Sequence, residues 1–202
     1  YDANYFQHIP YLETYSGKTS LFATCKVHYE PLGIYYGKEK KELLEGKSFE
    51  ICNDESNAVR ALKLLQEKGV LKEAPITNDG KLAFTGSTWI SDNDIKITLI
   101  SEELLVSSIN DYDFALLPCN TAYTGNVSSS RLVDKEDNQT LILENANVIA
   151  ARQNDYLEDS VYKKKIDVLT EAMLSKEGRE YIQKKYEGKI TCDEKTQIDL
   201  RK

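Results

Sequence analysis

A strand, a turn and a helix follow one another between residues 48 and 68, and this succession constrains the fold more than any other feature. Ser48–Cys52 has the short apolar pattern of a strand, and Asn53–Ser56 reads as a turn and helix cap. The helix places its apolar residues at i, i+3, i+4 and i+7, namely Ala58, Ala61, Leu62 and Leu65. Similar strand and helix patterns recur along the 202 residues, which predicts an α/β fold with a largely parallel sheet.

The other expected elements follow from the same patterns. Strands are expected at 21–29, 31–36, 95–100, 114–117 and 147–151, and a helix at 102–110. The tail is also expected to be helical, with one apolar stripe over 166–173 and another over 181–186 after a break at 175–178. Residues 73–94 hold Pro75, Asn78-Asp79-Gly80 and Gly86, so this stretch is expected to contain turns and short strands only.

Charge and cysteine usage exclude several classes of protein. A net charge of −7 has the wrong sign for binding a phosphate backbone, so no nucleic-acid partner is expected. The four cysteines form no CxxC motif, which argues against a metal site. No apolar run approaches the roughly 18 residues of a membrane helix. The sequence contains no dinucleotide-binding, P-loop or hydrolase motif, and no cofactor is expected.

Two predicted strands end in an asparagine-containing turn, Cys52-Asn53 and Cys119-Asn120, and ligands of open parallel sheets bind outside the carboxyl ends of strands. Asn57 and Arg60 lie one helical turn apart just beyond the first of them, where a helix N-terminus and a guanidinium would hold a carboxylate. Alternatively, Arg60 pairs with Glu55 or another surface acid, and Asn57 merely caps the helix.

Asn120 and Asn147 each follow or begin an apolar run, and an amide can meet either charged end of an amino acid. Each is equally compatible with an ordinary turn or strand-edge asparagine. Tyr5, Phe6 and His8 lie in an aromatic run that suits either a small-molecule pocket or a strand-to-helix corner in the core.

His28 and Glu30 read either as a solvated pair or as part of the same cleft. A Cys119 nucleophile with a histidine base has no supporting signature, so no catalytic residues are expected and the chain is not expected to be an enzyme.

Six segments together resemble the methionine-binding lipoprotein family (MetQ/NlpA type), beginning with the motif Asp-Ala-Asn-Tyr-Phe-Gln-His-Ile-Pro-Tyr-Leu. In the family's order they are residues 2–12, 28–35, 53–62, 120–123, 146–149 and 181–188. The resemblance implies a two-lobe periplasmic-binding-protein-like fold of type II with the ligand in the cleft between the lobes. Lobe 1 would comprise 1–33 and 150–202, without the family's N-terminal unit, and lobe 2 would comprise 34–149.

The family pattern also implies roles for the candidate residues. Arg60, supported by Asn57, corresponds to the arginine that holds the amino acid's carboxylate, and Asn120 and Asn147 correspond to the groups on its polar ends. Phe6 and His8, next to Tyr5, would border the ligand side chain. Replacing Arg60 by alanine should then cost at least about 1.5–3 kcal/mol of binding free energy.

By resemblance, the protein is a monomeric, noncatalytic receptor for L- or D-methionine or a related amino acid. It would deliver its ligand to the permease of an ABC importer. It would lie outside the cytoplasm, anchored to the membrane by lipid on a cysteine upstream of Tyr1.

The alternative is a divergent lipoprotein that acts as a sensor or adhesin for another small ligand. Leu104 and Ser107 replace the family's usual Gln and Arg, and residues 78–93 diverge, which leaves the ligand's identity open. A disulfide between Cys52 and Cys119 is also left open.

Overall fold

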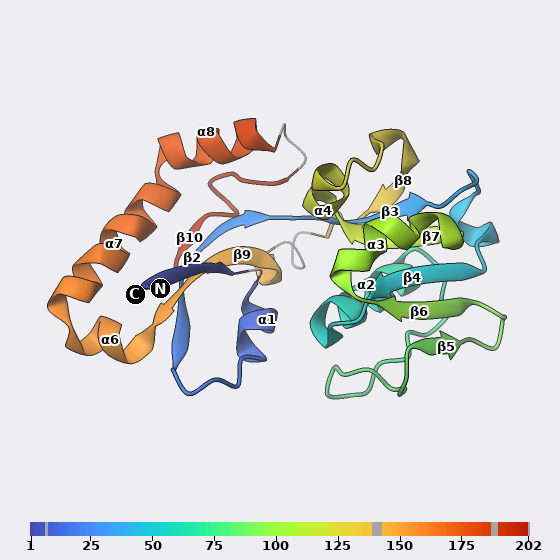
Figure 1. The fold of residues 1–202 in the computed structure, drawn as a ribbon, viewed down its shortest axis with the longest axis horizontal. Coiled ribbons are helices and arrows are strands. Elements are labelled where there is room, and N and C mark those ends of the chain that lie inside the picture. The colour runs from blue at the N-terminus through green and yellow to red at the C-terminus, as the bar shows by residue number, and fades with distance from the viewer. Residues whose placement is uncertain (7, 139–142, 187–189, 202) are drawn as a thin grey trace. The chain divides into compact units, whose positions relative to one another are not determined.

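The computed structural model of the chain describes residues 1–6, 8–138, 143–186 and 190–201, and these form two compact units (Figure 1). Unit 1 comprises Tyr1–Pro31 and Asp137–Lys202, and unit 2 comprises Leu32–Glu136. None of the helices in the described part of the chain combines the length and apolarity needed to cross a membrane.

Unit 1 is built on an antiparallel sheet with the strand order β1-β9-β2-β10. Its strands are β1 (Ala3–Phe6), β2 (Leu21–Tyr29), β9 (Ala146–Arg152) and β10 (Ile198–Asp199). Its helices are α1 (Ile9–Glu13), α6 (Gln153–Glu158), α7 (Ser160–Leu174) and α8 (Lys176–Lys185).

The helices of unit 1 cover opposite faces of this sheet because the side chains of a strand alternate between faces. Ile149 packs with Ile182 of α8, whereas Val148 packs with Leu12 of α1. A buried hydrogen bond of 2.9 Å from Thr170 of α7 to Thr24 of β2 fixes this helix on the sheet.

Unit 2 is a mixed sheet with the order β5-β6-β4-β7-β3-β8. Its strands are β3 (Leu32–Tyr36), β4 (Ser48–Cys52), β5 (Thr88–Ile90), β6 (Lys96–Ile100), β7 (Phe114–Pro118) and β8 (Leu132–Lys135). Its helices are α2 (Glu55–Glu67), α3 (Glu102–Ser108) and α4 (Cys119–Thr124), with 3-10 turns at Leu43–Glu45, Ile109–Asp111 and Ser129–Arg131.

The core of unit 2 also lies on both faces of its sheet. On one face, the apolar stripe of α2 packs on Phe49 and Ile51 of β4. On the other face, Leu105 of α3 and Ala122 of α4 pack on Leu117 of β7. Phe49 and Phe114 stack with their ring centroids 5.4 Å apart, which ties two neighbouring strands together inside the core.

The expectation of a largely parallel sheet was wrong. Only β4 with β6 and β4 with β7 run parallel among the described strand pairs, and every other pairing in both sheets is antiparallel. The physical reason is that one strand–helix–strand crossover at each side of β4 makes parallel neighbours, whereas the remaining strands are paired by chain reversals or by segments distant in sequence.

The observed junctions between the units differ from the expected lobe boundaries. The expected boundaries lay after residues 33 and 149, whereas the units divide after Pro31 and Glu136. β9 pairs with both β1 and β2, so the whole of Ala146–Arg152 belongs to unit 1.

Candidate functional site

The carboxyl ends of β4 and β7 meet at one edge of the sheet in unit 2, because these two strands are parallel neighbours. α2 follows β4 after a short turn, with Asp54 as its N-cap, and α4 follows β7 directly. The two asparagine-containing turns therefore lie at the same edge of the sheet. Asn57 and Arg60 on α2 and Asn120 in the first turn of α4 follow these two strand ends.

Arg60 is buried, with 7% of its side chain exposed, and forms a bidentate ion pair with Glu136. Its Nε donates to Oε1 at 2.7 Å and its Nη2 to Oε2 at 2.5 Å. The same carboxylate accepts a hydrogen bond of 2.8 Å from the backbone N–H of Leu32. The sequence suggested a surface acid such as Glu55 as an alternative partner, but the partner is a buried acid 76 residues further along the chain.

The two asparagines of unit 2 have their amides fixed locally. The side-chain amide of Asn57 donates to Asp54 at 2.9 Å, as does its backbone N–H, so Asp54 rather than Asn57 is the cap of α2. The side-chain oxygen of Asn120 accepts from the backbone N–H of Thr121 at 2.8 Å. Their roles toward a ligand stay predictions.

The candidate residues of unit 1 gather on β1, β2 and β9. His28 of β2 and Glu30, just after it, connect Tyr5 to Asn147. The Tyr5 hydroxyl contacts Nδ1 of His28, and the Asn147 amide donates to Glu30 at 3.3 Å. The His28–Glu30 pair is largely buried, so it is not the solvated pair that the sequence also allowed.

His8 and Phe6 have more local settings. His8 is 3% exposed and caps α1, with its Nδ1 accepting from the backbone N–H of Tyr11 at 3.1 Å. The backbone of Phe6 pairs with Val148, and its side chain lies outside the described part of the structure. The strand-to-helix corner expected as one alternative is therefore present at this motif.

Glu50 is a buried carboxyl that the sequence analysis missed. It lies on β4 at 0% exposure, accepts a hydrogen bond of 2.5 Å from Ser108, and finds no partner for Oε1 within the described residues. Burial raises the pKa of Glu50 to about 7, and the charge of Asp111 adds to this effect. An acid in an otherwise apolar strand is the only signal that the sequence offered.

The four cysteines are free thiols and all are buried. The thiol of Cys52 lies 2.8 Å from a carboxylate oxygen of Asp54, and that of Cys119 accepts from the hydroxyl of Tyr35 at 3.5 Å. Cys52 ends β4 and Cys119 directly follows its neighbour β7, but the two are not bonded to each other. Over the described ranges, no cluster of three or more His, Cys, Asp or Glu residues could hold a metal ion.

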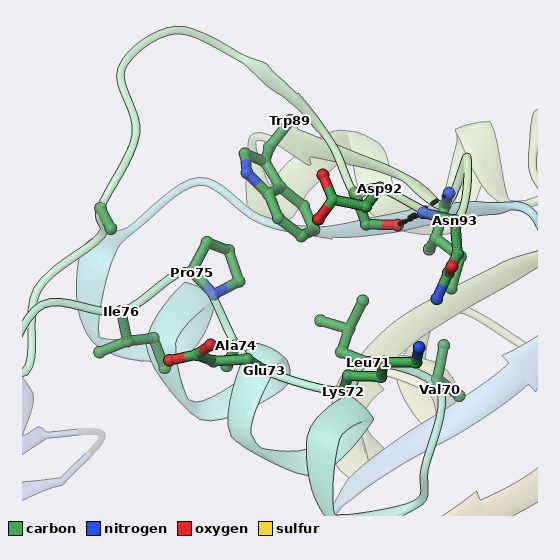
Figure 2. Close-up of a pocket in the computed structure, with 13 residues that line it drawn as sticks. Val70, Leu71, Lys72, Glu73, Ala74, Pro75, Ile76, Trp89, Asp92 and Asn93 are labelled. Atoms are coloured by element: carbon green, nitrogen blue, oxygen red, sulfur yellow. Dashed lines mark hydrogen bonds between the residues drawn. The ribbon is translucent and has the colours of Figure 1, made fainter.

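Unit 2 also carries a surface pocket of about 450 Å³ beyond the C-terminal end of α2. Figure 2 shows Trp89 on one side of it and Pro75 and Leu71 on the other, with the Asp92 carboxylate next to the indole. Part of its lining comes from the divergent residues 78–93, and none of the predicted site residues lines it. Of the two other divergent positions, Leu104 is 56% exposed on α3.

Comparison with known proteins places these features in context. The family described as NlpA lipoprotein matches residues 1–192. Methionine-binding lipoprotein MetQ of Bacillus subtilis is 31% identical over 202 residues, which cover 94% of this chain and 69% of the relative. Outer membrane lipoprotein 1 of Mannheimia haemolytica is 32% identical over 166 residues, or 76% of this chain and 56% of the relative. The chain thus spans little more than half of the second relative.

Solved structures give the same picture. A nutrient binding protein from Burkholderia cenocepacia bound to methionine superposes with a TM-score of 0.77 at 29% identity, covering 95% of this chain and 79% of that one. A lipoprotein from Ruminococcus gnavus superposes with a TM-score of 0.76 at 29% identity over 96% and 79% of the two chains.

Proposed function

The chain belongs to the NlpA lipoprotein family, and we propose that it is the solute receptor of an ABC importer that binds methionine or a related amino acid. The observation that carries the proposal is the likeness, over 95% of this chain, to a nutrient binding protein bound to methionine. The named relatives are binding lipoproteins rather than enzymes. The two-lobe α/β fold expected from the sequence is the fold of these relatives.

In this proposal the candidate residues bind the ligand as the family resemblance implies. Arg60, which Glu136 holds in place through Nε and Nη2, receives the carboxylate with its guanidinium. Asn57 and Asn120 lie at the same edge of the unit 2 sheet, and Tyr5, Phe6, His8 and Asn147 supply the unit 1 side. Methionine has about nine heavy atoms, so binding below a micromolar, about 8 kcal/mol, uses most of its polar groups.

The setting in the cell follows from the same proposal. The receptor acts as a monomer on the extracytoplasmic side of the membrane, where it is held as a lipoprotein, and it passes its ligand to an ABC permease. The relatives' names support the lipoprotein and methionine-binding parts of this proposal. The permease partner and the ligand cleft between the lobes are proposed from the family resemblance alone.

Titration calorimetry with L-methionine, D-methionine and the other proteinogenic amino acids tests the proposal. We expect one site with sub-micromolar affinity for one or both methionine enantiomers. At a methionine concentration 100 times the dissociation constant, the free energy of unfolding should rise by about 2.7 kcal/mol. Mass analysis should recover the amino acid unchanged. A protein that binds no amino acid would refute the proposal and favour the sensor or adhesin alternative.

A further inference from the structure

A β-bulge sets the orientation of His28 in unit 1. Lys26 lies opposite Val148 of β9, but the next pair along the ladder is His28 with Asn147, so Val27 is an extra residue on β2. An extra residue reverses the alternation of side chains beyond it. Without the bulge His28 would share the face of Lys26, whereas with it His28 shares the face of its partner Asn147.

The bulge completes a chain of polar contacts on that face. His28 contacts the hydroxyl of Tyr5 through Nδ1 and lies 2.8 Å from Oε1 of Glu30 through Nε2. The same Oε1 accepts from the amide of Asn147 at 3.3 Å. The ring of Tyr186 stacks on His28, with centroids 5.9 Å apart and planes 26° apart. The side chains of His28 and Glu30 are 3% and 13% exposed, so this geometry is held inside the fold.

The carboxylate of Glu30, in the middle of these contacts, determines which groups donate hydrogen bonds. An ionised carboxylate only accepts, so Nε2 of His28 carries the proton that Glu30 receives. In the neutral ring Nδ1 is then an acceptor, and Tyr5 donates its hydroxyl proton to it. Burial of the hydroxyl end raises the pKa of Tyr5, which keeps this proton in place at neutral pH.

Both ends of the chain are consequently left with acceptors to present. The Tyr5 oxygen has donated its proton, so only its lone pairs are offered to a ligand, and Tyr5 is still 45% exposed. The Asn147 amide turns its NH₂ toward Glu30, which directs its oxygen the other way. Two acceptors beside a largely buried carboxylate suit a cationic donor, and the donor of an amino acid is its ammonium group.

We propose that Glu30 is a positioning residue that, through His28 and Asn147, prepares unit 1 to bind the ammonium group of the ligand. The proposal rests on the proposed function and concerns only the ammonium end of the ligand. Glu30 acts by fixing the His28 tautomer and the Asn147 amide orientation rather than by touching the ligand.

Calorimetry with a pair of ligands tests this role. L-methionine is compared with 4-(methylthio)butanoate, which has hydrogen in place of the ammonium group. The wild type should prefer methionine, and Glu30→Gln should reduce that preference about tenfold or more while the affinity for the analogue stays within about twofold. Glu158→Gln, the same change at an exposed position of α6, should leave the preference unchanged. An unchanged preference in Glu30→Gln overturns the proposal.

The histidine resonances give a second test, because the protein has only two histidines. Nitrogen-15 NMR of the imidazoles should show His28 protonated on Nε2, and Glu30→Gln should shift its resonances while those of His8, the cap of α1, stay in place. A proton on Nδ1 of His28 would overturn the proposal. A wild type that binds methionine but fails either test rejects the role of Glu30 alone. A wild type that binds no amino acid rejects the proposed function and this role together.

Discussion

Replacing Glu136 by leucine should destabilise the protein strongly, because the change leaves a buried guanidinium without its counter-charge. The Glu136 side chain is 1% exposed and that of Arg60 7%. Breaking a buried ion pair by removing one partner costs about 3–5 kcal/mol of unfolding free energy. The backbone N–H of Leu32 also loses its carboxylate acceptor. In a chain of this size the melting temperature should fall by about 6–20 °C.

The double variant Arg60→Met with Glu136→Leu is the matched control. It removes both charges and refills the space with apolar atoms, a change that is often neutral or stabilising by about 1–4 kcal/mol for a buried pair. Urea unfolding at 25 °C, followed by circular dichroism, measures all three proteins. A loss below about 1 kcal/mol in Glu136→Leu would mean that the pair behaves as an exposed one, and our reasoning would be wrong.

The same double variant separates stability from binding. It should fold, yet it lacks the guanidinium proposed to hold the ligand's carboxylate, so its affinity for methionine should fall by at least about 1.5–3 kcal/mol. A single Arg60→Ala variant cannot separate the two effects, because it also strands Glu136 in the core. Calorimetry on the double variant gives the answer, and wild-type affinity there would exclude Arg60 as the carboxylate ligand.

Three further outcomes are expected. Between pH 4.5, the ordinary pKa of a glutamate, and pH 7, the buried Glu50 is protonated in the folded state only. The free energy of unfolding should therefore decrease by about 3 kcal/mol as the pH rises over this range. Urea titrations of Glu50→Gln should show no such pH dependence. Phe114→Ala removes a fully buried ring stacked on Phe49 and should cost about 3–5 kcal/mol, and a loss below about 1 kcal/mol would contradict the packing. Burial raises the pKa of all four cysteines, to about 12 for Cys52, so a thiol reagent at pH 8 should label them slowly until the protein is unfolded; rapid labelling would show an exposed thiol.

Local patterns predicted the elements well where the chain's own residues decide them. The strands at Leu21–Tyr29 and Ser48–Cys52 have the expected bounds, and α2 begins and ends within a residue or two of its expected limits. The short helix Cys119–Thr124 and the strand Leu132–Lys135 were missed. They lie in a polar stretch without an apolar period, and pairing with β3 rather than local propensity stabilises the strand.

The site was predictable in its residue types but not in their partners. The spacing of Asn57 and Arg60 shows that they share a helix, but no local pattern links Arg60 to Glu136 across 76 residues. The face on which His28 lies was likewise not predictable, since the extra residue at Val27 exists only relative to β9. Pairing between distant segments therefore set the chemistry that local sequence patterns left open.

The contact between Leu32 and Glu136 has a consequence for how such a chain can be rearranged. These are the first and last residues of unit 2, and the backbone N–H of Glu136 donates to the carbonyl of Leu32 at 3.0 Å, so the unit enters and leaves its host at one point. A segment whose ends adjoin can be inserted into a surface loop of another protein without stretching either chain. Residues 32–136 thus have the geometry of a transplantable module, with their ends already joined by hydrogen bonds.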